Sequence, residues 1–157
     1  MGLKTKLGLS LAAGAISIAT AVVSFYEGYE STAYRDPVGI PTICYGHTET
    51  ARLGQTLSQA ECTALLQQDL GDAFAVVDRR TKVALSAPTR AALASFVYNV
   101  GAGNFAHSTL LRKLNAGDLH GACHELSRWV YASGRRLNGL VKRRATEREL
   151  CLEGLAP

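Results

Sequence analysis

Residues 27–48 of this 157-residue chain read EGYESTAYRDPVGIPTICYGHT. The stretch contains two turn signals, Asp36-Pro37-Val38-Gly39 and Tyr45-Gly46, set among β-branched and aromatic residues. Proline and glycine favour tight turns, whereas β-branched and aromatic side chains favour extended strands. With the residues that follow, this pattern predicts a small antiparallel sheet over residues 33–57.

Helix signals come after the predicted sheet. Ser58 and Glu61 form a capping-box pattern, so a helix is expected to begin there. Its apolar residues recur at helical spacing and are Leu65, Leu66, Leu70, Phe74 and Val77. Caps and glycine stops predict four further helices, over residues 87–99, 108–116, 118–131 and 138–152. A small sheet followed by a helical lobe is an α+β fold, in which a cleft between the lobes is the expected ligand site.

Length and composition indicate one globular domain, because 47% of the residues are hydrophobic and 19% are charged. The formal net charge is +4. Residues 135–148 alone carry +5, since six basic residues are opposed there only by Glu147. This basic segment is either a site for an anionic polymer or nucleic acid, or a solvated helix face.

The N-terminal segment is uncharged over residues 7–26. As a helix, these 20 residues would span about 30 Å, the thickness of the hydrocarbon layer of a bilayer. Lys4 and Lys6 precede the segment, so the bias toward cytoplasmic basic residues places residues 27–157 outside the cytoplasm. Many of its residues are small or hydroxylated, which predicts a marginal residence in the bilayer. The alternatives are a signal peptide cleaved after the Ala-Thr-Ala of residues 19–21 and a buried helix of a cytosolic protein.

Two carboxylates, Glu27 and Asp36, stand nine positions apart within residues 27–48. Cleavage of a glycosidic bond needs one carboxylic acid to protonate the leaving oxygen and a second carboxylate on the other side of the sugar. Glu27 follows an apolar segment, whereas Asp36 begins a polar turn, so the two groups lie in different environments, as separate acid and base roles require. Their spacing alone does not distinguish them from surface carboxylates.

Residues 27–48 closely resemble the active-site signature of the phage-type lysozymes, glycoside hydrolase family 24. The resemblance continues through residues 95–105, 121–129 and 139–148, which look like the helical lobe and C-terminal signature of lambdoid-phage endolysins. It implies a lysozyme-like fold, with Glu27 as general acid, Asp36 activating the attacking water and Thr42 positioning that water for inverting hydrolysis. The substrate would be the β-1,4 bond between N-acetylmuramic acid and N-acetylglucosamine in bacterial peptidoglycan. No cofactor or metal is implied.

The same resemblance implies roles for other residues. Asn99 and Arg143 are expected in the substrate cleft, although the sequence does not decide whether Arg143 or Arg144 lies beside Glu27. His47 is expected to pair with Asp69 on the following helix, in a structural role.

Four cysteines, at positions 44, 62, 123 and 151, form an even number without a CxxC pair. They allow three disulfide pairings after export, or would stay as buried thiols in a reducing compartment. Cys44 stands where many family members have glycine, a departure found in exported members. The resemblance implies the pairs Cys44–Cys62 and Cys123–Cys151.

The resemblance further suggests an endolysin of the signal-arrest-release type. Residues 1–26 would be the N-terminal signal-arrest-release or transmembrane segment, and residues 27–157 the catalytic domain. The protein would be exported, tethered to the inner membrane transiently through residues 7–26, and then released into the periplasm to act on peptidoglycan. We expect a monomer that binds no nucleic acid.

Three other interpretations are weaker. His120 and His124 lie one helical turn apart and suggest zinc, but no acidic third ligand stands at a fixed spacing. A catalytically inactive wall-binding protein would keep the same fold, and a nucleic-acid binder using residues 135–148 conflicts with export. Trp129 and Phe96 are either core residues or walls of the cleft, with the core favoured.

Overall fold

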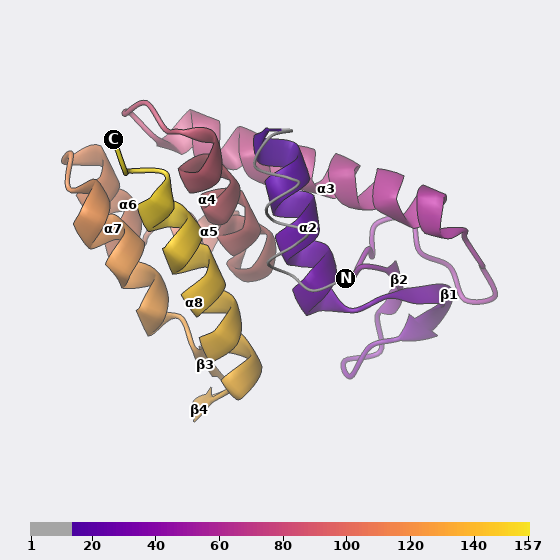
Figure 1. The fold of residues 1–157 in the computed structure, drawn as a ribbon. Helices are drawn as coiled ribbons and strands as arrows, with labels where there is room; N and C mark the ends of the chain where they lie inside the picture. The colour runs from indigo at the N-terminus through magenta and orange to yellow at the C-terminus, as the bar shows by residue number, and fades with distance from the viewer. Residues whose placement is uncertain (1–13) are drawn as a thin grey trace.

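The computed structural model describes residues 14–157 of the chain and shows a helical lobe joined to a small β lobe (Figure 1). Helix α2, Ala15–Glu27, leads into the β lobe, whose strands are β1, Glu30–Arg35, and β2, Pro41–Cys44. The remaining elements are α3 Gln59–Arg80, α4 Ala87–Val100, α5 Ala102–Ala106, α6 Thr109–Asn115, α7 Leu119–Glu125, the 3₁₀ helix η1 Leu126–Arg128, β3 Tyr131–Ala132, β4 Arg135–Arg136 and α8 Asn138–Glu153. The predicted α+β arrangement is confirmed.

The β lobe is an antiparallel hairpin of β1 and β2, in the region where the sequence predicts a sheet. Glu30 pairs with Cys44 and Tyr34 with Thr42, and an isolated bridge joins Thr32 to Thr56. Asp36 organises the turn between the strands, because its Oδ1 accepts hydrogen bonds from the backbone N–H groups of Val38 and Ile40, at 2.9 and 2.8 Å.

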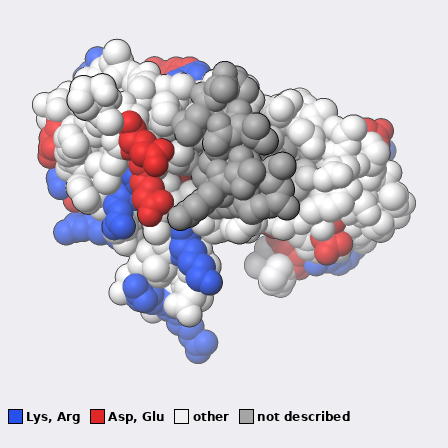
Figure 2. All heavy atoms as spheres, viewed as in Figure 1, with Lys and Arg blue, Asp and Glu red and all other residues white. Residues whose placement is uncertain are grey.

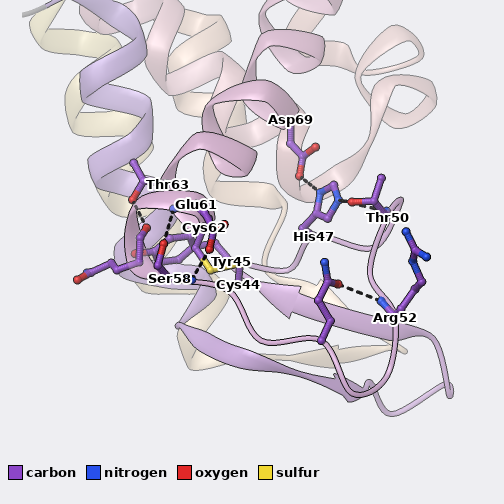
Figure 3. The surroundings of a disulfide bond; sticks show 12 residues. Cys44, Tyr45, His47, Thr50, Arg52, Ser58, Glu61, Cys62, Thr63 and Asp69 are labelled. Atoms are coloured by element: carbon purple, nitrogen blue, oxygen red, sulfur yellow. Dashed lines mark hydrogen bonds and ion pairs between the residues drawn. A yellow bond between two sulfur atoms is a disulfide. The ribbon is translucent and has the colours of Figure 1, made fainter.

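Most predicted helices begin where their caps stand. Ser58 caps α3 with a complete capping box, in which the Ser58 backbone N–H donates to Glu61 and the Glu61 N–H donates to the Ser58 hydroxyl (Figure 3). These hydrogen bonds from Ser58 lower the pKa of Glu61. The helices predicted over residues 87–99, 108–116 and 138–152 agree with α4, α6 and α8 to within one residue at each end.

The prediction of one continuous helix over residues 118–131 is wrong beyond Glu125. The chain passes through η1 and turns back in the hairpin of β3 and β4, which was not predicted, and neither was α5. Ser133 and Gly134 form the two-residue turn, with φ of 50° and 74°. Two consecutive positive φ angles are typical of the tight hairpin turns that match strand twist.

The hydrophobic core is centred on α4, which packs against α2, α3 and α8. Helix α2 contributes four residues to this core, and each of them is 0% exposed: Ile18, Ala19, Val22 and Val23. Full burial of an isoleucine or valine side chain contributes roughly 1.5 to 3 kcal/mol, so α2 is well anchored. Within residues 14–157, no helix is both long and apolar enough to cross a bilayer. Residues 7–13 of the uncharged segment lie outside the described residues.

Two disulfides connect elements that are distant in the sequence. Cys44 of β2 is bonded to Cys62 of α3, and Cys123 of α7 to Cys151 of α8. This is the pairing that the family resemblance implied. The first bond fixes the β lobe to the helix that follows it (Figure 3).

Candidate active site

Glu27 is the last residue of α2 and lies where the helical lobe meets the β lobe. Its Oε1 accepts a hydrogen bond of 2.6 Å from Nη1 of Arg143, so the two side chains form an ion pair. The Glu27 side chain is 24% exposed, whereas that of Arg143 is only 4% exposed. The carboxyl group is therefore held from the protein side while part of it faces solvent. Of the two arginines left open by the sequence, it is Arg143 that contacts Glu27.

Behind this ion pair lies a buried network centred on Glu147. Oε1 of Glu147 accepts from the Ser95 hydroxyl at 2.7 Å and from Nε of Arg143 at 3.2 Å. Its other oxygen accepts from Arg144, whose guanidinium also donates to the side chain of Asn99. Burial lowers the pKa of Arg144, an effect that Glu147 opposes. The network thus links the residue beside Glu27 to Asn99 on α4.

A groove runs past Glu27. One cavity of about 380 Å³ is lined by Glu27, Gly46, His47, Thr48, Glu49, Asp69, Tyr98 and Asn99. A second, also about 380 Å³, is lined by Asn99, Val100, Asn104, Trp129, Tyr131, Ala132, Leu137, Leu140 and Arg144. Asn99 lines both, so the two cavities meet at its side chain. The first cavity is lined mainly by polar and charged side chains, whereas the second also has an apolar wall, and both have the size of a small-ligand site.

His47 and Asp69 lie in the first cavity and contact each other, as the resemblance implied. Nδ1 of His47 is 2.7 Å from Asp69 Oδ2, and its Nε2 is 2.7 Å from the hydroxyl of Thr50 (Figure 3). Since both ring nitrogens have partners and the residue is buried, this histidine fixes the loop after β2 to α3. Its role in the fold is structural.

Tyr98 and Gly46 also line the first cavity, and the sequence assigned neither of them a role in the site. The Tyr98 hydroxyl donates to the Tyr45 carbonyl at 2.7 Å, and burial, followed by the charge of Glu27, raises the pKa of Tyr98. A Cβ added to Gly46 would lie 3.4 Å from Oε2 of Glu27. Gly46 lies in the predicted turn and in the active-site signature of residues 27–48, and Tyr98 lies in the family-like segment of residues 95–105, but neither signal indicated a place beside Glu27.

Asp36 and Thr42 lie on the hairpin of β1 and β2, and neither is among the residues that line the two cavities. Asp36 is held by its turn hydrogen bonds, with one carboxylate oxygen engaged. The Thr42 hydroxyl donates to the Ile40 carbonyl at 2.9 Å, and Thr42 is 5% exposed. Both side chains therefore have fixed positions on the β lobe.

The two aromatic residues left open by the sequence divide between core and groove. Phe96 is fully buried in the core. Trp129 is partly buried, packs edge-on against Phe96 with ring centroids 5.3 Å apart, and lines the second cavity. Within residues 14–157, no group of three or more histidine, cysteine or acidic side chains is placed to hold a metal ion.

Comparison with known proteins defines the class to which this fold and groove belong. The model of the phage lysozyme family matches residues 24–147. A SAR-endolysin of Enterobacteria phage PA-2 is 45% identical over 159 residues, covering 97% of this chain and 96% of that protein. The chain therefore belongs to the phage lysozyme family. It is a glycosidase of the endolysin class that hydrolyses peptidoglycan.

Solved structures support the same class. The muramidase domain of SpmX from Asticaccaulis excentricus superimposes with a TM-score of 0.81 at 31% identity, over 88% of this chain and 95% of that one. A P22 lysozyme mutant superimposes with a TM-score of 0.77 at 30% identity, over 85% and 94%. The predicted lysozyme-like fold is confirmed.

Proposed function

We propose that Glu27 is the general acid of the hydrolysis and protonates the leaving oxygen of the β-1,4 bond between N-acetylmuramic acid and N-acetylglucosamine. The observation that carries this proposal is the position of Glu27, whose carboxyl group lines the groove while Arg143 fixes it from behind. A general acid must be held within hydrogen-bond reach of the bound glycan, and a fixed carboxyl at the edge of a groove meets that need. Asn99, which lines both cavities, would bind the sugar chain, and Arg143 would position the acid.

Asp36 and Thr42 are proposed to act on the attacking water, Asp36 as the base and Thr42 by orienting the molecule. In an inverting glycosidase, the second carboxylate stands far enough from the acid to leave room for that water on the opposite face of the sugar. Support comes from their place on the hairpin that follows the helix ending at Glu27, and from the hydrogen bonds that fix both side chains. One oxygen of Asp36 has no hydrogen-bond partner among residues 14–157, and it would accept the proton of the water.

The test is Glu27→Gln, which keeps the shape of the side chain and removes its proton. We expect nearly complete loss of clearing of a cell-wall suspension, with unchanged circular dichroism. Glu30→Gln, an exposed carboxyl on β1, is the matched control and should keep full activity. Mass analysis of the products then identifies the reaction as hydrolysis, because hydrolysis leaves a reducing-end muramic acid. A folded Glu27→Gln protein with normal turnover would refute the assignment.

We further propose that residues 7–26 tether the newly exported protein to the inner membrane, facing the periplasm, until the segment leaves the bilayer. The SAR-endolysin relatives support this, as does the uncharged sequence. The side chains of Ile18, Val22 and Val23 suit either environment, because lipid tails and a protein core are similarly apolar. Since Glu27 ends the helix that contains them, a membrane-inserted helix would hold the acid away from the β lobe. Tethering would therefore keep the enzyme inactive until release.

Replacing Gly14, Ser17 and Thr20 by leucine tests this proposal. All three are only partly buried in the folded protein, and each leucine raises the affinity for lipid by about 0.5 kcal/mol. At Gly14, where φ is 96°, any side chain also strains the folded backbone, and the alanine variant controls for this effect. We expect the leucine variant to stay in the membrane fraction without lysing cells, and the corresponding alanine variant to be released. The detergent-solubilised leucine protein should regain activity, which shows that it can fold. Lysis by the leucine variant at the normal time would refute the release proposal.

A further inference from the structure

An excess of positive charge gathers around the β3–β4 hairpin and the first half of α8. Figure 2 shows lysine and arginine side chains on this part of the surface. The exposed or partly exposed cations are Arg135, Arg136, Lys142 and Arg148. Between residues 126 and 148 the only acid is Glu147, which is fully buried and already paired with Arg143 and Arg144. None of the four surface cations forms an ion pair with an acid of residues 14–157, although Glu125 and Glu149 flank the segment.

Part of this surface is hollow. A cavity of about 200 Å³ lies between η1, β4 and α8. Its polar lining consists of one hydroxyl and three guanidinium-bearing side chains, those of Ser127, Arg136, Arg144 and Arg148. The remaining lining residues, Val130, Val141 and Ala145, are apolar, and no carboxylate lines the cavity. This cavity does not reach Glu27, because the residues that line it and those that line the first groove cavity are separate sets.

Two of the arginines retain free donors. Nη1 of Arg148 donates to the Ser127 hydroxyl at 2.9 Å, which leaves the proton of that hydroxyl free to be donated onward. Arg136 has no hydrogen bond or ion pair to any side chain of residues 14–157. Arg144 is different, because its guanidinium is engaged by Glu147, Asn99 and the Trp129 carbonyl. The free donors are thus those of Arg136, Arg148 and Ser127.

From this arrangement we propose that the cavity binds a phosphoryl anion. Guanidinium groups present forked donors that match phosphate oxygens, and such charge-assisted hydrogen bonds are about twice as strong as neutral ones. Inorganic phosphate offers four acceptor oxygens, and a phosphodiester offers two non-bridging oxygens with two ester oxygens beside them, to donors that converge from three elements. A carboxylate offers two oxygens and is satisfied by a single arginine fork. Donors that come from Arg136, Arg148 and Ser127 together therefore favour the phosphoryl group.

The phosphoryl group has two possible sources at the place where this enzyme would work. One is free phosphate, and the other is the headgroup of an anionic phospholipid in the membrane that faces the periplasm. A headgroup bound here would hold the protein close to the membrane. Arg144 lines both this cavity and the second groove cavity, so the bound anion would sit beside the glycan groove without entering it.

The experiment uses the full-length chain in two arms. In the first, inorganic phosphate is titrated into the protein at low ionic strength and followed by calorimetry, with acetate as the carboxylate probe. In the second, the protein is sedimented with vesicles of phosphatidylcholine alone or mixed with phosphatidylglycerol, so that the uncharged vesicles report binding through residues 7–26. Each arm compares Arg136→Gln/Arg148→Gln with Arg52→Gln/Arg79→Gln, two exposed arginines elsewhere with the same change in net charge.

We expect the Arg136→Gln/Arg148→Gln protein to lose at least about tenfold in affinity, a difference of 1.4 kcal/mol, while the control variant binds like the parent. Binding of free phosphate identifies a soluble anion site, and binding only of phosphatidylglycerol vesicles identifies a headgroup site; either supports the proposal. It is overturned if neither probe binds, if both variants weaken binding equally, or if acetate binds as tightly as phosphate.

Discussion

Nη1 of Arg143 donates a hydrogen bond of 2.6 Å to Oε1 of Glu27, although the two residues are 116 positions apart. The same guanidinium is fixed by buried acceptors, because it also donates to Glu147 and to the carbonyl of Ser95. The position of the Glu27 carboxyl is therefore set by the contact of α2 with α8 and α4. The proposed acid at the end of α2 therefore reaches this position only when α2 is packed against α4 and α8.

Replacing Arg143 by glutamine should impair turnover more than substrate binding. The variant loses the charge that holds Glu27, and a displacement of about 1 Å at a reacting group can cost on the order of 100-fold in rate. We therefore expect kcat on soluble wall fragments to fall by about that factor, with KM changed much less. Lys142→Gln, an exposed neighbour on α8, should leave both constants unaltered. A similar kcat for the two folded variants would contradict a positioning role for Arg143.

Glu147 should matter for stability. Its side chain is 0% exposed and neutralises two buried arginines. Removal of one partner of a buried ion pair leaves an uncompensated charge and typically costs about 3 to 5 kcal/mol. Glu147→Ala is expected to lower the free energy of unfolding in urea by that amount. Glu149→Ala, on the exposed side of the same helix, should change it by less than about 0.5 kcal/mol. Equal effects would show that the network adds no stability.

Local signals predicted the elements whose ends are fixed by nearby residues. Ser58 and Glu61 specify the start of α3, because the capping box is formed within four residues. The helix predicted through residue 131 failed because its end depends on a hairpin, in which the Leu137 N–H donates to the Val130 carbonyl at 2.9 Å. No cap or proline marks that change in the sequence, since the turn at Ser133 and Gly134 carries only one glycine.

The residues of the candidate site also differ in whether a local motif or a contact between distant elements defines them. The motif of residues 27–48 singled out Glu27 and His47. The resemblance implied the contact of His47 with Asp69, whereas the sequence left open which arginine lies beside Glu27. Ser95 and Glu147 fall within segments that resemble the family, but the sequence assigns neither of them a role in the site. Their roles depend on packing between α4 and α8, which brings together residues 52 positions apart. Two of the arginines in that basic segment proved to be buried partners of acids, so neither contributes to an exposed basic face.

Cys44 offers a test of backbone strain on the β lobe. Its φ is 62°, in the left-handed region that favours glycine, and many family members have glycine there. For a residue with a side chain this conformation costs roughly 1 to 2 kcal/mol. The disulfide bond to Cys62 must therefore hold the Cys44 backbone in this conformation. With the disulfide removed, Cys44→Gly/Cys62→Ser should therefore be more stable than Cys44→Ser/Cys62→Ser by about 1 kcal/mol. Thermal unfolding of the two proteins measures the difference, and a more stable serine variant would contradict this explanation.

Gly46 should be needed for activity beyond its backbone angle. Its φ is 82°, and a Cβ there would lie 3.4 Å from Oε2 of Glu27 and 3.9 Å from the Tyr98 hydroxyl. Gly54 has a similar φ of 88° but faces open space, so it provides a matched control. Alanine at either position should cost about 1 kcal/mol of stability, because both require the left-handed conformation. Only Gly46→Ala narrows the groove at the proposed acid, and we expect it alone to lower kcat. If Gly54→Ala lowers kcat equally, the loss comes from the loop backbone, and close approach to Glu27 is not the reason for the glycine.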